Sequence, residues 1–127
     1  MPRHAEPSWL IEEWPLADQR AWTTALEAGD TLAPGGNASH WRQSTARTVA
    51  RSYGHFVKWL DAIERLDMGA EAASQVTVEN VAEYIIVIRT PLSSQTVAGR
   101  IGHICMAAKA MKPDADWSWL SNIWKRL

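Results

Sequence analysis

The sequence predicts an all-α protein, a compact bundle of about five helices. Apolar residues recur every three or four positions over several separate stretches, which is the spacing that places one apolar stripe along a helix. Proline, glycine and hydroxyl residues stand between these stretches, where helices begin and end. The 127 residues are 46% hydrophobic, which is enough for one domain with a buried core.

The first forty residues form an acidic part of the chain. Residues 1–15 contain three prolines and are expected to be irregular, and a first helix is expected at Leu16–Ala28. Pro15 suits the start of that helix because its missing N–H is not needed there, and Gly29 suits its end. The expected apolar anchors are Leu16, Trp22 and Leu26. A loop at residues 30–37 divides this part, residues 1–40, from a helical bundle at residues 41–127 within one domain.

A long helix at Trp41–Leu66 is expected to organise the bundle. Its apolar residues are spaced 3, 4, 3, 4 and 3 apart and are Ala46, Val49, Tyr53, Phe56, Leu60 and Ile63. The other side carries three cations, Arg47, Arg51 and Lys58, with Ser44, Gly54 and His55 between them. One side therefore requires a core, with Phe56 and Leu60 nearly fully buried, and the other offers positive charge. A solvated surface with no binding role is the plainer interpretation of that charge.

Three further helices are expected after it. Thr77 is a suitable N-cap for a helix from Val78 to about Arg89, which Pro91 ends. Its expected stripe consists of Val78, Val81, Ala82, Ile85 and Ile88.

Ser93 or Ser94 can cap the next helix, which reaches Met111. Its expected stripe consists of Val97, Ile101, Ile104, Ala108 and Met111. Asp114 or Asp116 can cap a last helix, whose stripe is Trp117, Leu120, Trp124 and Leu127. Eight tryptophans in so short a chain indicate that several of them hold helices together.

Composition excludes several classes of protein. The single cysteine, Cys105, permits no intrachain disulfide, suits a reducing, cytoplasmic setting and is expected to be a small core residue. No apolar run is long enough to span a membrane, and no secretory signal is recognisable. Phosphate-binding glycine loops, CxxC pairs and metalloprotease motifs are missing from the sequence. We therefore expect no enzyme activity, metal or cofactor.

The net charge of −1 is unevenly distributed. Residues 1–40 hold two basic and six acidic groups, whereas residues 41–112 hold nine basic and six acidic groups. The charge that could attract a polyanion therefore lies in the middle of the chain, at a modest +3.

The helix at Ser93–Met111 also has a polar side, on which Thr96, Arg100 and His103 are expected to face outward. Gly99 and Gly102 lie on the same helix, where each glycine costs about 1 kcal/mol relative to alanine. Such a cost is tolerated where another helix or a phosphate strand must approach closely.

The order of these features resembles the N-terminal core-binding domain of tyrosine recombinases, the phage-integrase type with a SAM-like helical fold. The resemblance covers roughly residues 10–127. The segments that carry it are Trp41–Thr45, Tyr53–Leu60, Val76–Ile85, Leu92–Val97 and Met111–Trp117. No single segment is diagnostic, but together they agree in order and spacing. One departure lies at Arg42 and Gln43, where several relatives have Ser or Thr with Pro after the Trp.

The resemblance implies a module for DNA recombination and integration that covers one side of duplex DNA, while a separate catalytic domain of the same parent protein covers the other. The residues expected to contact DNA are Arg42, Gln43, Ser44, Arg47, Arg51, Lys58, Ser94, Gln95, Thr96, Arg100 and His103. Since the family's catalytic residues belong to that second domain, we expect a fragment or a truncated gene product that binds DNA weakly and cuts none.

A second hypothesis is a non-catalytic protein–protein interaction domain. Trp9, Trp14 and Trp22 near one end, and Trp117, Trp119 and Trp124 near the other, would then bind a partner or mediate self-association. Trp119 and Ile123 lie off the stripe of the last helix, which gives that helix more apolar surface than one core contact uses.

Overall fold

The computed structural model describes residues 8–29, 32 and 34–127, and every regular element in this part of the chain is a helix. A short 3-10 turn, η1 (Ile11–Glu13), precedes five α-helices. These are α1 (Leu16–Leu26), α2 (Gln43–Ala62), α3 (Val78–Ile88), α4 (Ser94–Met111) and α5 (Ser118–Lys125). The predicted all-α class with five helices is confirmed.

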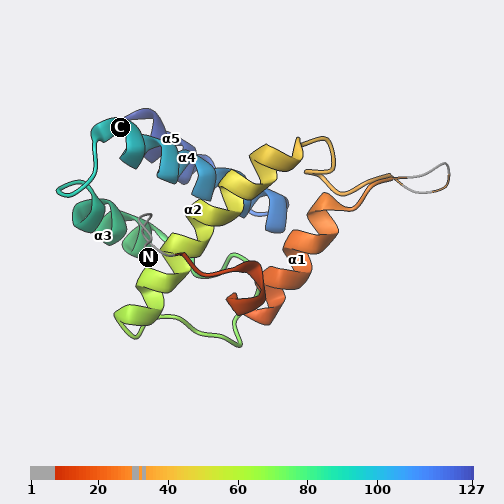
Figure 1. Ribbon diagram of the computed structural model, residues 1–127, viewed down its shortest axis with the longest axis horizontal. Helices are drawn as coiled ribbons and strands as arrows, with labels where there is room; N and C mark the ends of the chain where they lie inside the picture. Colours follow the sequence, from red (N-terminus) through yellow and green to blue (C-terminus); the bar gives the residue numbers. More distant parts are fainter. Residues whose placement is uncertain (1–7, 30–31, 33) are drawn as a thin grey trace, which may run out of the picture.

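The two longest helices, α2 and α4, cross near their middles and begin at opposite sides of the molecule (Figure 1). Contacts between α2 and α4 are the most extensive of any helix pair, and α4 also contacts α1, α3 and α5. The bundle is therefore built around α4 as much as around α2, the helix expected to organise it.

Aromatic rings hold α1, α2 and α3 together in the core. Tyr53, Phe56 and Leu60 on α2 are completely buried, which confirms the predicted core face. The rings of Trp14 and Tyr53 meet edge to face at 4.9 Å, and those of Phe56 and Tyr84 at 5.2 Å. Trp14 precedes α1, and its ring also meets that of Trp22 on α1 edge to face at 5.6 Å. Such pairs contribute beyond the area they bury, so these rings join three helices into one core.

The ends of two predicted helices are wrong. Helix α2 ends at Ala62, and Ile63 is 39% exposed because the chain turns there, with a positive φ of 60° at Glu64. Helix α1 ends at Leu26, where the backbone N–H of Gly36 donates to the Glu27 carbonyl at 2.9 Å.

The buried side of α1 also differs from the prediction. Trp22 is buried, but Leu16 is 52% exposed, and the first inward residue is Asp18. The Tyr53 hydroxyl donates to Asp18 Oδ2 at 2.8 Å, and the Ala73 N–H donates to Oδ1 at 2.7 Å. Burial raises the pKa of the Asp18 carboxyl, and the two hydrogen bonds oppose that rise. This carboxylate joins α1, α2 and the loop before α3.

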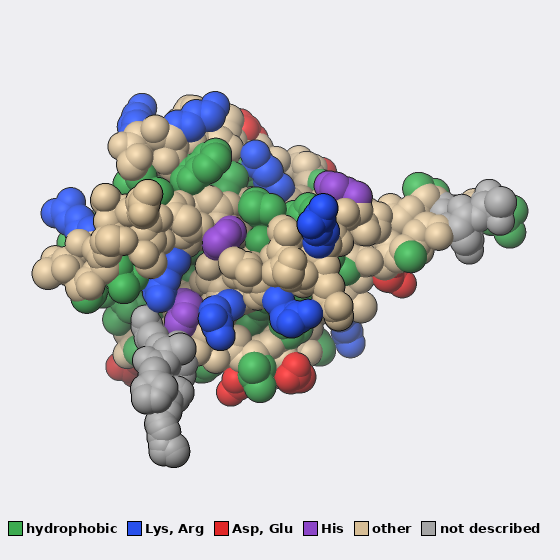
Figure 2. Space-filling model, turned by 45° about the horizontal axis from the view of Figure 1, so that its top comes forward, with side chains coloured by type: hydrophobic (Ala, Val, Ile, Leu, Met, Phe, Trp, Pro, Cys, Tyr) green, Lys and Arg blue, Asp and Glu red, His purple; other side chains and the backbone are tan. Residues whose placement is uncertain are grey.

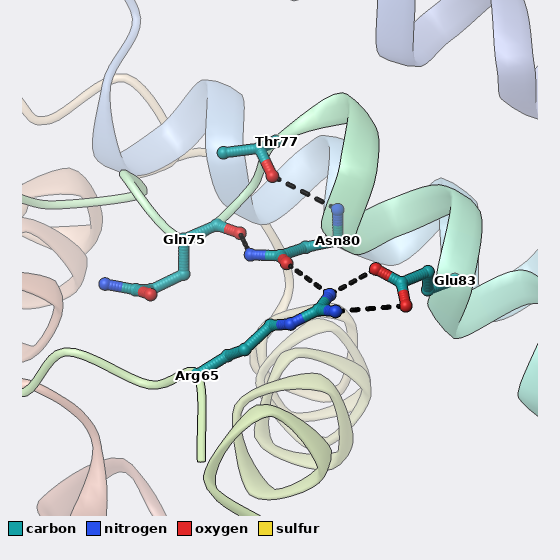
Figure 3. A network of polar contacts seen from close by, with 5 residues as sticks. All are labelled: Arg65, Gln75, Thr77, Asn80 and Glu83. Carbon is teal, nitrogen blue, oxygen red and sulfur yellow. Dashed lines mark hydrogen bonds and ion pairs between the residues drawn. The ribbon is translucent and has the colours of Figure 1, made fainter. Parts of the chain in front are cut away.

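A polar network fixes the start of α3 to the loop after α2 (Figure 3). Thr77 Oγ1 accepts from the Asn80 N–H at 3.1 Å, which confirms the predicted N-cap. Both carboxylate oxygens of Glu83 accept from the Arg65 guanidinium, which also donates to Asn80 Oδ1 at 3.3 Å. The Asn80 side chain donates in turn to the Gln75 carbonyl at 2.9 Å. This network ties the first two turns of α3 to the loop after α2.

The side of α3 that faces the core differs in part from the predicted one. The residues of α3 that are buried are Val81, Tyr84 and Ile88. Val78 and Ala82 were predicted to be inward but are exposed, and Ile85 is half-buried. Tyr84 takes the inward place because its ring contacts Phe56 and Trp59.

The prediction for α4 is confirmed, whereas that for α5 is only partly right. All five residues of the α4 stripe are buried, Cys105 is buried among them, and Ser93 caps the helix through the Thr96 N–H at 3.2 Å. In α5, Trp117 and Leu120 are buried, but Trp124 and Leu127 are 43% and 46% exposed. Trp124 instead lies over Gly102, where a Cβ atom would come within 2.8 Å of its indole nitrogen.

Part of the predicted N-terminal organisation lies outside the described residues, namely residues 1–7 of the irregular segment and positions 30, 31 and 33 of the loop. Within the described ranges, none of the helices is long and apolar enough to cross a membrane.

Candidate nucleic-acid interface

A surface hollow of about 320 Å³ lies where α2 crosses α4. Its lining residues come from one segment of each helix and are Arg51, Ser52, His55, Thr96, Gly99, Arg100 and His103. None of these described lining residues is acidic, and four of them can carry positive charge. We call this feature the α2/α4 hollow. Figure 2 shows Lys and Arg side chains gathered around histidines on the face that these helices form.

One contact fixes the floor of the α2/α4 hollow. Ser52 Oγ and His103 Nδ1 are 2.9 Å apart, so a residue of α2 holds the imidazole of α4 in place. Ser52 is 6% exposed and His55 8% exposed, whereas His103 is half-buried. Burial lowers the pKa of His103 because it disfavours the charged imidazolium. The neutral form of His103 is therefore favoured near pH 7.

Two arginines line the same hollow from different helices. Arg51 is exposed on α2, and Arg100 is half-buried on α4. The Arg100 guanidinium donates to the Tyr84 hydroxyl at 3.3 Å, which ties this side chain to α3. A guanidinium carries five N–H donors in a planar fork that suits phosphate oxygens. Arg51 and Arg100 thus offer a pair of such donors to one anion.

A second hollow continues this surface along α2 toward its start. It is lined by Ser44, Arg47, Thr48 and Arg51, so the two hollows share Arg51. Together they make a continuous basic track, which follows one side of α2 and then crosses onto α4. We call it the α2/α4 basic track.

The structure brings some of the predicted DNA-contacting residues together and leaves others apart. Arg51, Thr96, Arg100 and His103 line the α2/α4 hollow, and Ser44 and Arg47 line its continuation. Arg42 and Gln43 are exposed where α2 begins, and Ser94 and Gln95 where α4 begins, at the other side of the molecule (Figure 1). Lys58 is half-buried and lines neither of these two hollows.

Two details of the predicted polar sides are wrong. Arg100 and His103 are half-buried because they face the crossing of the helices, and only Thr96 is exposed as predicted. Gly54 and His55 are buried, although they were placed among the outward residues of α2. The segment at Ser8 and Trp9 covers Gly54, and the Trp9 N–H donates to the Gly54 carbonyl at 3.4 Å.

Sequence reasoning did not include Ser52, Thr48 or His55 among the expected DNA contacts, although it placed His55 on the positive side of its helix. Ser52 follows Arg51 directly, and Thr48 follows Arg47, but no local pattern distinguishes them from ordinary helix residues. Their place becomes visible only when the crossing with α4 is known. The 2.9 Å contact between Ser52 and His103 depends on that crossing, since 51 positions separate the two residues.

The site offers donors for an anion and little for covalent chemistry. A hydroxyl at 2.9 Å from an imidazole has the distance of a nucleophile and its base. Such a pair also requires a third group that orients the base, and the contacts of His103 within the described part of the chain do not include one. Among the described residues, no three His, Cys, Asp or Glu side chains gather to hold a metal ion.

Comparisons of the chain with protein-family models, with curated proteins and with solved structures found no match.

Proposed function

We propose that this chain binds duplex DNA through the α2/α4 basic track, as the core-binding module of a tyrosine recombinase or integrase. The observation that carries the proposal is the pairing of Arg51 with Arg100. Arg51 from α2 and Arg100 from α4 line one hollow whose described lining residues include no carboxylate. The sequence segments that resemble the recombinase family place their expected DNA contacts on the same two helices.

The chemistry of the track suits a phosphate backbone. Arginine, serine, threonine and histidine are the side chains that donate to phosphate oxygens, and such contacts position a protein on DNA without reading its sequence. The track supplies such side chains from two helices, beginning at Ser44 on α2 and ending at His103 on α4. Because the middle of the chain carries only a modest positive charge, isolated binding should be weak, with a Kd on the order of micromolar or weaker at physiological salt.

The catalytic chemistry of such a recombinase would belong to a separate domain of the parent protein. In this arrangement the present chain covers one side of the duplex and contributes to affinity, and it cuts no strand by itself. A nicking assay on supercoiled plasmid, with and without divalent metal, addresses this point. Protein-dependent nicking that survives repurification would contradict it.

Fluorescence anisotropy with labelled duplex DNA at two salt concentrations tests the proposal. Arg51→Ala and Arg100→Ala should each weaken binding about equally for unrelated duplex sequences and lower the salt slope by roughly 1, because each removes one phosphate contact. Lys109→Ala is the matched control. Lys109 is an exposed cation on the same helix, but it lies about two and a half turns beyond Arg100 and lines a different hollow.

The control should bind as tightly as the unaltered protein and keep its salt slope. If all three variants lose affinity to the same extent, binding follows net charge and not the track. If none does and circular dichroism shows intact helices, the positive side of α2 is only a solvated surface.

The exposed end of α5 favours a second candidate, a protein–protein contact. Trp124 in the last turn of this helix and Leu127 just after it are both more than 40% exposed. Self-association through them would make the sedimentation coefficient rise with protein concentration, and Trp124→Ser would remove the rise. A concentration-independent monomer would argue against self-association through α5.

A further inference from the structure

His103 is held in a way that leaves one ring nitrogen for a ligand. Its Nδ1 is engaged by Ser52 Oγ at 2.9 Å, so Nε2 is the nitrogen that can serve an anion in the α2/α4 hollow. A hydroxyl can either donate or accept. Ser52 can therefore donate to Nδ1 of the neutral ring and accept from Nδ1–H of the charged ring, so this contact is compatible with both protonation states.

We propose that a phosphate group of the DNA backbone binds in the α2/α4 hollow between Arg51 and Arg100, and that His103 takes up a proton as the phosphate binds. This inference rests on the proposed function and adds a regulation to it, since affinity then depends on pH. The proton comes from solvent and is held at Nε2 or Nδ1 of His103, with no bond broken in the DNA.

The direction of the effect follows from the surroundings of His103. Burial lowers the pKa of the imidazole in the free protein, so the ring enters the complex uncharged near neutral pH. A phosphate in the hollow favours the charged ring, because opposite charges raise the pKa of a histidine. Binding and protonation therefore strengthen each other, and affinity rises as the pH falls.

Among the described residues, the other charged or titratable groups that line the hollow come from both helices. Arg51 from α2 and Arg100 from α4 remain charged throughout the range in which histidine titrates. His55 from α2 also lines the hollow and is the one other described lining residue that can titrate near neutral pH. From α3, the Tyr84 hydroxyl accepts from Arg100 and does not titrate in this range. An experiment on the pH dependence of phosphate binding therefore has to distinguish protonation of His103 from protonation of His55.

Duplex DNA binding between about pH 5.5 and pH 8, at constant ionic strength, separates these two histidines. The unaltered chain should bind more tightly at the acid end, by up to about tenfold per pH unit for one linked proton. His103→Gln keeps a polar partner for Ser52 but does not titrate, so it should lose this slope. His40→Gln, at an exposed position before α2, should keep it.

A slope that persists in His103→Gln would overturn the proposal. So would a slope that is lost in His55→Gln while His103→Gln retains it, since the proton would then belong to His55.

A second measurement uses the unaltered protein without DNA, so it does not depend on whether a variant folds. The NMR titration of the His103 ring in the unaltered protein should show a higher pKa in sulfate than in chloride, because sulfate is a tetrahedral oxyanion that does not itself titrate in this range. An unchanged pKa overturns the proposal even where DNA binds. A raised pKa in a protein that binds no duplex supports the oxyanion site and overturns the DNA-binding function instead.

Discussion

Gly54 of α2 and Gly99 of α4 both lie inside a long helix, yet their surroundings differ. A Cβ atom at Gly54 would come within 2.3 Å of the Trp9 carbonyl oxygen, because the segment before η1 lies against α2 at this point. A Cβ atom at Gly99 would meet nothing within 4 Å, since this glycine lines the α2/α4 hollow. One glycine marks a covered side of a helix and the other an open side.

The difference predicts that substitutions affecting stability and substitutions affecting the proposed DNA binding fall at different places in this molecule. Helix α2 is covered at two places, namely its aromatic core face and, on another side of the helix, Gly54, where the segment at Ser8 and Trp9 packs. Substitutions at either place should change the free energy of unfolding. The open side between α2 and α4 holds the arginines and histidines of the basic track, so substitutions there should change DNA affinity. A glycine within a helix costs about 1 kcal/mol relative to alanine wherever it lies. Its surroundings show whether another segment needs the space that a side chain would fill.

The largest expected effect is in the core, at Leu60. This side chain is completely buried and belongs to the same core cluster as the aromatic rings. Leu60→Ala should lower the free energy of unfolding by about 2–5 kcal/mol, because it removes apolar contacts and leaves a cavity. Urea unfolding followed by circular dichroism measures the change. A loss below about 1 kcal/mol would mean that the core relaxes around this position.

Alanine substitutions at the two glycines should change the stability of the protein by intermediate amounts and in opposite directions. Gly54→Ala should destabilise the protein by about 1–3 kcal/mol, because the new methyl group must displace the backbone at Trp9. Gly99→Ala should stabilise it by about 1 kcal/mol, because alanine favours the helix and the space is open. Thermal unfolding of both variants measures the difference. Equal changes would mean that the two helix sides are not distinct in the way described.

The smallest expected effect on stability is on the basic track. Arg47→Ala/Arg51→Ala should change the free energy of unfolding by no more than about 0.5 kcal/mol, since both side chains are exposed. The same double variant should bind DNA more weakly than the unaltered chain. A large loss of stability here would show that the track also holds the fold together, and the separation of stability from binding would fail.

Local patterns predicted most of the fold. The stripe of α4 and the caps at Thr77 and Ser93 depend on residues three or four positions apart, and they are confirmed. Asp18 could not be recognised as a core residue, because its partners lie 35 and 55 positions away. The exposure of Trp124 was missed for the same reason, since it depends on where α5 lies against Gly102.

The candidate site was predictable only in part. Periodicity placed Arg47, Arg51 and Arg100 on polar helix sides, and the structure places all three along the track. The expectation that Arg42, Gln43, Ser94 and Gln95 act together with them came from the resemblance. These residues lie at the starts of two helices that begin at opposite sides of the molecule (Figure 1). The described lining of the hollow comes instead from the middle of α2 and from α4 between Thr96 and His103. Crossing geometry is set by the packing of whole helix faces, which no single segment specifies.

The buried carboxylate of Asp18 has a consequence for the order in which the molecule is assembled. Its bonds to Tyr53 and to the Ala73 amide join α1, α2 and the loop before α3 at one point. The entropy lost in closing a long loop is recovered only when its contacts form. Both bonds end on the carboxyl group of Asp18, so neither can form until α1 is in place. Detachment of α1 would therefore remove a hydrogen-bond acceptor from α2 and from the loop before α3 at the same time.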